Sequence, residues 1–348
     1  MARVLVVGGA GYIGSLLTKQ LLSRGHLVRI LDRFYFGRES IRDLEAEVEL
    51  VQADMRRIPE SALVDIDAVL NLGGLSNDPT ANYNPAANWE MNHVAVIRLA
   101  ERCKASGIKR YLFTSSCSVY DRRSSSAQTD TLFTEEHPVD PIGHYAEAKY
   151  QAEKDLLAMA DDCFSPVIFR FGTVFGYSPR MRFDLVVNSM VRDALAHRVI
   201  TLHGGGETWR PLLNVEDAAR ALVIALESKP EDTHAQIFNV VYQNLRIAEL
   251  GLRVQHTLRT LGVSAEVVAD YSRPAARNYR VSGQKLENIL GFRPEVTVEE
   301  SVKALVAKFR VLDGYELHHP RFFNIRWMQL LEEAARLLNC DGSVFACE

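Results

Sequence analysis

Short apolar runs alternate with longer amphipathic stretches along the first half of the chain. The run Arg3 to Val7, for example, is almost entirely apolar and is followed by glycines. A continuous run of this kind is typical of a strand that is buried on both faces of a parallel sheet. Similar runs predict further strands at Leu27 to Leu31, Val48 to Gln52, Ala68 to Leu72, Arg110 to Thr114 and Pro166 to Phe171.

Helix-compatible stretches lie between several of these runs. They predict helices over Ile13 to Arg24, Ala86 to Ala105 and Tyr145 to Ala160. Strands that alternate with helices indicate βαβ units, in which successive strands are parallel. The expected fold class is therefore α/β, with a Rossmann-like, doubly wound parallel sheet.

The pattern changes after Phe175, where turn clusters replace the alternation and indicate a smaller mixed α/β lobe. We expect a Rossmann domain over residues 1–175, with later contributions near 205–240, and a discontinuous substrate-binding lobe over 176–312. Residues 313–348 would form a helical extension. Within it, apolar residues at helical spacing predict an amphipathic helix over Phe322 to Leu338, which would pack on the body or on a neighbouring subunit.

The composition argues against several classes of function. With 40 Lys and Arg against 44 Asp and Glu, the formal net charge is −4 and no basic run stands out, so we expect no nucleic-acid partner. No stretch reaches the roughly 18 apolar residues of a membrane helix, and the first apolar run is too short for a secretory signal. The five cysteines are odd in number and scattered, which argues against disulfides or a metal site and favours a cytoplasmic location.

The first predicted strand leads directly into a glycine-rich turn. Gly8, Gly11 and Gly14 have a GxxGxxG spacing and open the first predicted helix. Glycines allow a sharp turn, so that a diphosphate can approach backbone amides at a helix amino terminus. The second strand leads to Asp32, whose carboxylate can bind ribose hydroxyls and repel a 2′-phosphate. These features predict NAD as the cofactor, although the neighbouring Arg33 weakens the argument against NADP.

A tyrosine and a lysine lie one turn apart at the start of a predicted helix. Tyr145 and Lys149 are four residues apart, so their side chains lie on one helix face. An ammonium and a nicotinamide cation both favour the phenolate, so we expect the pKa of Tyr145 to fall toward neutral pH. Upstream, a predicted strand runs into a cluster of serines, one of which would hydrogen-bond the reacting oxygen. The pattern indicates proton transfer at a sugar hydroxyl, coupled to hydride transfer.

With these motifs, residues 1 to 310 resemble the nucleotide-sugar epimerase/dehydratase family of extended short-chain dehydrogenases. Family members carry Thr-Ser-Ser-x-x-Val-Tyr at this strand end, which implies a catalytic triad of Ser116, Tyr145 and Lys149. The resemblance also implies an NAD-dependent enzyme that acts on a nucleotide sugar, as a homodimer that pairs through a bundle containing the Tyr-Lys helix. The expected cofactor-contacting residues are Gly8, Gly11, Tyr12, Ile13, Gly14, Asp32, Asp54, Met55, Leu72, Gly73, Gly74, Asn92, Thr114, Tyr145 and Lys149.

Two positions depart from the dehydratase members of this family. Those enzymes place an Asp-Glu pair directly after the catalytic threonine to eliminate water, whereas this chain has Cys117 and Ser118. The difference weakens the dehydratase interpretation. Cys117 is a candidate acid/base residue if the pKa of its thiol is perturbed, and otherwise a small buried residue that lines the pocket.

The resemblance implies the substrate contacts as well. Arg210 follows a glycine loop and Arg273 begins an arginine segment, at positions that resemble those where family members bind the substrate diphosphate. A guanidinium suits this task because it can bind two phosphate oxygens at once. Thr173 replaces the substrate-binding asparagine of the family. The expected substrate-binding residues are Thr173, Asp184, Asn188, Arg210 and Arg273, with Arg277 and Arg280 as further candidates.

The leading hypothesis is transient oxidation of a sugar carbon, most simply C4, followed by its reduction from the other face. This is epimerase chemistry, which needs no acid pair. The alternatives within the enzyme class are a net dehydrogenase or ketoreductase and a dehydratase with unusual acid/base groups. A non-catalytic dinucleotide-binding regulator would not need Tyr145 or Lys149, yet both are present.

Overall fold

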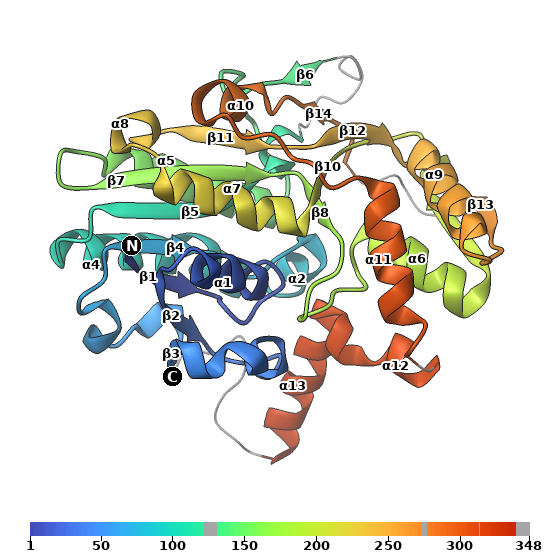
Figure 1. Ribbon diagram of the computed structural model, residues 1–348, viewed down its shortest axis with the longest axis horizontal. Coiled ribbons are helices and arrows are strands. Elements are labelled where there is room, and N and C mark those ends of the chain that lie inside the picture. The colour runs from blue at the N-terminus through green and yellow to red at the C-terminus, as the bar shows by residue number, and fades with distance from the viewer. Residues whose placement is uncertain (122–130, 273–276, 313, 339–348) are drawn as a thin grey trace.

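A computed structural model describes residues 1–121, 131–272, 277–312 and 314–338. Its centre is a parallel sheet of seven strands in the order β11-β7-β5-β4-β1-β2-β3 (Figure 1). The expected Rossmann-like sheet is therefore confirmed. The strands are β1 (Arg3–Val7), β2 (Leu27–Asp32), β3 (Val48–Gln52), β4 (Ala68–Asn71), β5 (Arg110–Ser116), β7 (Ser165–Phe171) and β11 (Ile237–Val240).

Helices cover both faces of this sheet, because successive residues of a strand point to opposite sides. Val4 and Val6 of β1 belong to the core under α1 and α7, whereas Leu5 and Val7 belong to the core under α4 and α5. Two buried faces explain why a central strand such as β1 is almost entirely apolar, whereas the edge strand β3 is only partly buried and carries Glu49 and Gln52. The covering helices are α1 (Gly14–Ser23), α7 (Val215–Glu227), α4 (Ala95–Ala105) and α5 (His144–Ala158).

Part of this layer comes from the second half of the chain. The strand β11 extends the sheet beyond β7, and α7 packs against α1. We expected contributions near 205–240, but the short run that forms β11 was not predicted as a strand. Its four residues become recognisable as a strand only through their pairing with β7.

The helix expected over Ala86 to Ala105 is interrupted in the structure. A π-helical turn, η4 (Glu90–Val94), joins α3 (Pro85–Trp89) to α4. Such turns inside helices are frequent at functional sites. Asn92 lies within this turn, so the irregularity affects one of the predicted cofactor residues.

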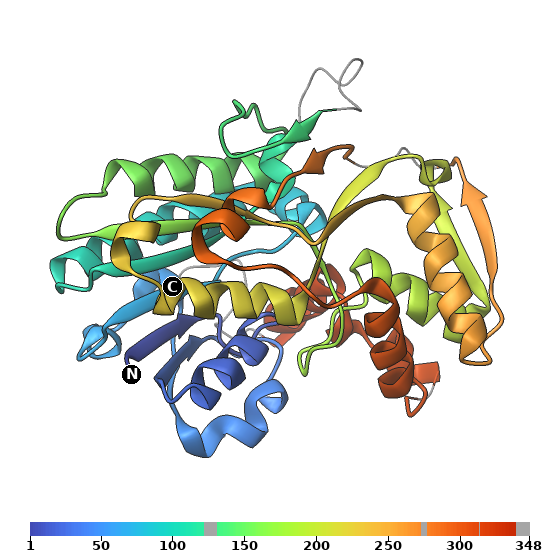
Figure 2. The same ribbon diagram turned by 45° about the horizontal axis from the view of Figure 1, so that its top comes forward.

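A smaller mixed α/β lobe, seen at the right of Figure 2, lies beside the central sheet. Its core contains buried apolar side chains such as Phe183, Leu250 and Val302. Its elements are β8 (Thr173–Phe175), β9 (Val199–His203), β10 (Trp209–Asn214), β12 (Gln243–Arg246), β13 (Glu266–Asp270), α6 (Val186–His197), α9 (Ile247–Thr260), α11 (Val298–Phe309) and α12 (Gly314–His318). The remaining elements are β6 (Leu132–Phe133), β14 (Arg280–Val281), α2 (Asp78–Tyr83), α8 (Pro230–Thr233) and α10 (Gln284–Leu290).

The expected C-terminal amphipathic helix is present as α13 (Asn324–Leu338), after a 3-10 turn, η7 (Pro320–Phe322). It packs on the body of the same chain, where it contacts α2. In Figure 1 it is the red helix beneath the sheet. Within the described part of the chain, no helix combines the length and the hydropathy that crossing a bilayer requires.

Candidate active site

A cavity of about 490 Å³ opens where the carboxyl ends of the central strands meet the smaller lobe. This is the edge at which parallel α/β sheets bind ligands. The residues predicted for the cofactor and for catalysis, Cys117 excepted, line it. They are Gly8, Gly11, Tyr12, Ile13, Gly14, Asp32, Asp54, Met55, Leu72, Gly73, Gly74, Asn92, Thr114, Ser116, Tyr145 and Lys149.

The glycine turn between β1 and α1 forms one wall of the cavity. Gly8 has a φ of +79°, a conformation that other residues rarely adopt. A Cβ atom on Gly14 would collide with the carbonyl oxygen of Gly8, and one on Gly73 would lie 2.6 Å from Sδ of Met55. Side chains at these positions would displace the backbone. Their absence gives a diphosphate access to the start of α1.

Asp32 is held rigidly at the end of β2. Its carboxylate accepts hydrogen bonds from the backbone N–H of Ala10 at 3.1 Å and of Phe34 at 2.8 Å. Burial nevertheless raises its pKa. The neighbouring Arg33 forms an ion pair with Asp54 at 2.6 Å, so its charge is balanced within the protein. This arrangement suits a ribose hydroxyl beside Asp32 better than a 2′-phosphate.

Three buried polar atoms on the cavity wall have no hydrogen-bond partner among the described residues. They are the hydroxyl of Tyr35, Oδ1 of Asn92 and Nη1 of Arg180. A buried polar group without a partner is costly, so such atoms indicate that a polar ligand completes the site. Together with the glycine turn and Asp32, they fit a dinucleotide.

The predicted triad residues come together at one end of the cavity. Tyr145 and Lys149 lie in the first two turns of α5, and Ser116 ends β5. The Tyr145 phenol hydrogen-bonds the Ser116 side chain. The ammonium of Lys149 donates to the backbone carbonyl of Thr114 at 3.0 Å and lies 4.6 Å from the ring centre of Phe113. A serine, a phenol and an amine therefore meet where the dinucleotide cradle ends.

The two ionisable groups of the triad differ from the expectation drawn from sequence. Burial raises the pKa of Tyr145, which Arg277, Arg182 and the hydrogen bond from Ser116 only partly oppose. Burial also lowers the pKa of Lys149 to about 7. The expected lowering of the phenol pKa by Lys149 is thus absent, because desolvation penalises both charged forms. At neutral pH the phenol is protonated and the lysine is close to its midpoint.

Lys149 should link stability to pH. Because burial lowers its pKa from 10.5 to about 7, the folded protein binds fewer protons than the unfolded chain between these values. As pH rises from 7 toward 10, this group therefore adds up to about 1.4 kcal/mol per pH unit to the free energy of unfolding. Below pH 7 the lysine is charged in both states, so the fold carries the whole cost of burying that charge. We expect Lys149→Met to remove this gain in denaturant unfolding across the window. Lys154→Met, at an exposed position of α5, is the control. An unchanged slope in Lys149→Met would contradict the lowered pKa.

Guanidinium groups form another part of the cavity wall, and the charges of two of them, Arg277 and Arg182, act on the Tyr145 phenol. Arg210, Arg277 and Arg182 line the cavity together with Thr173. Arg210 is held by its hydrogen bonds to the backbone carbonyls of Trp209, at 2.7 Å, and of Arg277. Burial lowers the pKa of Arg210, and the neighbouring charge of Arg277 lowers it further. This part of the cavity is suited to an anion such as a diphosphate.

The sequence profile of the NAD dependent epimerase/dehydratase family matches residues 4–240. The chain belongs to this family. The resemblance drawn from the motifs is therefore confirmed, and the protein is an NAD-dependent enzyme of the epimerase/dehydratase type.

Several known proteins are similar to this chain over most of its length. A UDP-glucuronic acid decarboxylase 1 from Arabidopsis thaliana is 28% identical over 318 residues, which are 88% of this chain and 70% of the relative. A UDP-glucose 4-epimerase from Lactobacillus helveticus is 26% identical, over 88% of this chain and 95% of the relative. A Bacillus cereus UDP-glucuronic acid 4-epimerase, solved with UDP-glucuronic acid and NAD, shares the fold, with a TM-score of 0.77 and 23% identity over 89% of this chain and 100% of that one.

Cys117 of this epimerase/dehydratase lies outside the cavity wall. Its side chain is buried, and its thiol donates to the backbone carbonyl of Arg170 at 3.1 Å. Burial raises the pKa of the thiol well above its usual value. The structure therefore favours neither of the interpretations drawn from sequence, acid/base residue or pocket lining. The hydroxyl of Ser118 is likewise buried outside the wall.

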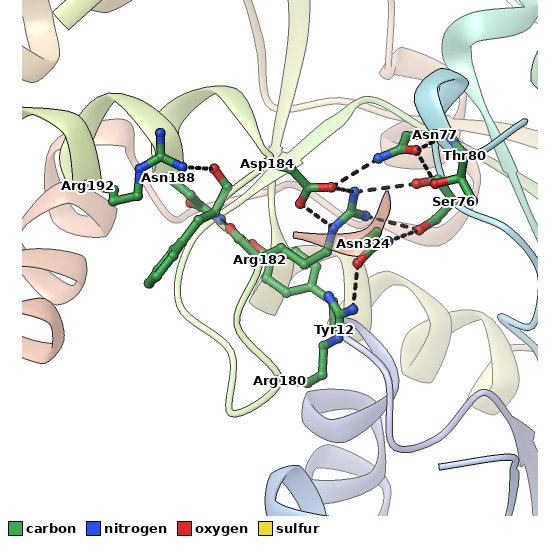
Figure 3. Close-up of polar contacts among 11 residues, drawn as sticks. Tyr12, Ser76, Asn77, Thr80, Arg180, Arg182, Asp184, Asn188, Arg192 and Asn324 are labelled. Atoms are coloured by element: carbon green, nitrogen blue, oxygen red, sulfur yellow. Dashed lines mark hydrogen bonds and ion pairs between the residues drawn. The ribbon is translucent and has the colours of Figure 1, made fainter. Parts of the chain in front are cut away.

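Asp184 and Asn188 were expected to border the sugar pocket, but neither lines the cavity. Their polar atoms instead form hydrogen bonds and an ion pair within the protein (Figure 3). Asp184 pairs with Arg182 at 2.9 Å and accepts a hydrogen bond from Asn77 at 3.0 Å. Asn188 accepts from the backbone N–H of Gly176 and donates to the hydroxyl of Tyr12. Both thus hold residues that line the cavity or lie close to it.

One predicted site residue falls outside the described part of the chain, and three residues that line the cavity were not predicted. Arg273 falls outside the described residues, and Arg277 of the same segment is the arginine that the structure places in the cavity. Tyr35, Asn324 and Met328 also line it but were not predicted. Tyr35 follows Asp32 closely, which could have drawn attention to it, but no sequence motif marks Asn324 or Met328.

Proposed function

We propose that this enzyme modifies a nucleotide-activated sugar by transient oxidation at C4 and works as an epimerase. The observation that carries the proposal is the meeting of Ser116, Tyr145 and Lys149 in the same cavity as the dinucleotide cradle and a cluster of arginines. The family relationship supports it, since the similar proteins named above act on UDP sugars.

The residues divide the chemistry between them. Ser116 would orient the C4 hydroxyl by a hydrogen bond. Burial keeps the Tyr145 phenol protonated, but the positive charge of the nicotinamide would lower its pKa, so that the phenol would lose its proton to solvent. The resulting phenolate would take up the hydroxyl proton as the carbonyl forms. Lys149, close to its midpoint at neutral pH, would favour the charged phenolate during that step. NAD would supply the hydride acceptor and, on return, the donor. Arg210 and Arg277, on the same cavity wall, would hold the substrate diphosphate.

The surroundings of the triad favour epimerisation over elimination of water. Elimination needs an acid that protonates the leaving hydroxyl. The two residues that follow Ser116 are buried away from the cavity, and Cys117 has a raised pKa. Reduction of the intermediate from its other face requires no further acid.

A panel of nucleotide sugars, incubated with the purified protein in deuterated water and followed by mass spectrometry and product chromatography, tests the proposal. We expect inversion at C4 without solvent label for at least one sugar. Solvent label at C3 or C5 would indicate enolisation, and loss of water or of carbon dioxide would indicate a dehydratase or a decarboxylase. Each of these outcomes, or accumulation of NADH with a stable keto sugar, would overturn the epimerase proposal. Cys117→Ala should behave as the parent enzyme does.

We also propose that the enzyme is a cytoplasmic homodimer. The support is the family resemblance, which implies pairing through a bundle that includes α5, and the scattered cysteines, which suit a reducing compartment.

A further inference from the structure

We propose that residues 320–338, formed by η7 and α13 and here called the clasp, are part of the dinucleotide site and keep NAD bound between turnovers. The proposal rests on the proposed function only in that NAD is the cofactor. The Bacillus cereus epimerase is matched over its whole length by 89% of this chain, so part of this chain has no counterpart there. The family profile matches residues 4–240, and the clasp lies outside this range.

The clasp connects two loops on opposite sides of the cofactor cradle. The indole N–H of Trp327 donates to the backbone carbonyl of Tyr35, in the loop after β2, at 2.6 Å. The side-chain amide of Asn324 donates to the hydroxyl of Ser76, in the loop after β4, at 2.7 Å. Because β1 lies between β2 and β4 in the sheet, the start of α13 spans the edge at which the glycine turn opens.

An apolar contact reinforces this connection. Met328 is only 5% exposed and packs in a small core with Leu75, Ala87 and Met91. Partly buried rings of Tyr35 and Phe36 and the side chain of Leu331 surround this core. Asn324 and Met328 also line the cavity itself, so the clasp is a wall of the site.

Asn324 also positions a buried cation. Its carbonyl oxygen accepts a hydrogen bond from Nη2 of Arg180 at 2.5 Å (Figure 3). The guanidinium lies 3.6 Å from the ring centre of Phe36, and burial, with the charge of Arg182, lowers the pKa of Arg180 to about 9. Its other nitrogen, Nη1, is buried and has no partner among the described residues. Since Asn324 and Phe36 fix the plane of the guanidinium, this nitrogen is held ready for a polar atom of the bound cofactor.

A bound dinucleotide would then lie beneath α13, whose first turn is held by the hydrogen bonds of Asn324 and Trp327 to the two loops. Release of NAD would require the contacts of Asn324, Trp327 and Met328 to break together. A cofactor that does not exchange must be returned to its oxidised form within each turnover. The clasp therefore suits a redox-neutral reaction such as epimerisation and does not suit a net dehydrogenase, which must exchange NADH for NAD.

Exchange of bound NAD for isotope-labelled NAD tests the clasp without any nucleotide sugar. The NAD-loaded protein is mixed with excess labelled NAD, and samples are desalted over time and analysed by mass spectrometry. We expect Asn324→Ala and Met328→Ala to exchange at least about ten-fold faster than the parent, from the loss of a hydrogen bond to a charged group or of a buried apolar contact. Leu330→Ala, at a position of α13 that is 44% exposed, should exchange at the parent rate.

Several outcomes would overturn the proposal. These are parent-like exchange in Asn324→Ala and Met328→Ala, equal acceleration in Leu330→Ala, or a loss of thermal stability without faster exchange at temperatures where the variants are folded. If either alanine variant does not fold, Trp327→Phe, which removes only the indole donor, should still accelerate exchange. A parent protein that binds no NAD at all would contradict the proposed function, whereas rapid exchange in a protein that does bind NAD would contradict only the clasp.

Discussion

Tyr145→Phe is expected to lower kcat by about 10²–10⁴-fold, because it removes the group that exchanges a proton with the sugar hydroxyl. The ring would keep its place, since Tyr145 is set by the first turn of α5 and lies against the cavity wall. NAD binding should change little, because the phenol oxygen bonds Ser116 rather than the glycine turn or Asp32. The measurement is steady-state turnover of the sugar identified in the panel, alongside a titration with NAD.

Tyr150→Phe on the same helix is the matched control. Tyr150 does not line the cavity, so removal of its hydroxyl should leave kcat close to that of the parent. Turnover by Tyr145→Phe within a few-fold of the parent, with NAD still bound, would show that another group transfers the proton. A large loss in both variants would instead indicate disturbance of α5.

The sequence was sufficient to predict those parts of the fold that are defined locally. The run Arg3 to Val7 coincides with β1 because a strand buried on both faces is almost entirely apolar. The run Val48 to Gln52 coincides with β3, an edge strand that is only partly buried and keeps Glu49 and Gln52 exposed. Other features depend on distant partners. β11 has only four residues and is defined by pairing with β7. The π-turn around Asn92 interrupts a stretch whose sequence is compatible with one continuous helix.

The same distinction applies to the site. Gly8, Asp32, Tyr145 and Lys149 were predicted because their spacing is itself the signal. Asn324 could not be found in this way, since it reaches the cavity through contacts with residues more than a hundred positions away.

The pKa directions could not be predicted from sequence either. The four-residue spacing of Tyr145 and Lys149 shows their proximity but not their burial. Burial is what raises the pKa of Tyr145 and lowers that of Lys149.

A buried ion pair beneath the triad is expected to be the most sensitive point for stability. Glu153 lies one turn beyond Lys149 on α5 and is 1% exposed, and its partner Arg170 on β7 is 3% exposed. Their side chains meet at 2.6 Å, and Arg170 also donates to the hydroxyl of Tyr120 at 2.8 Å. Ser115 donates to the same carboxylate. Few positions in the described chain combine a charge with such complete burial.

Glu153→Ala should lower the free energy of unfolding by about 3–5 kcal/mol, because it leaves the buried Arg170 without its counter-charge. The double variant Glu153→Leu with Arg170→Met should lose less, since it removes both charges at similar volume. Denaturant unfolding measures both. Arg293→Ala, which breaks an exposed pair with Glu287, should leave the unfolding transition unchanged. If the double variant were as unstable as Glu153→Ala, shape rather than the unpaired charge would be the cause.

Glu153 also raises the pKa of Lys149, so its loss should move the pH-dependent rise in stability to lower pH. That shift would show that the buried pair and the active-site lysine are electrostatically coupled.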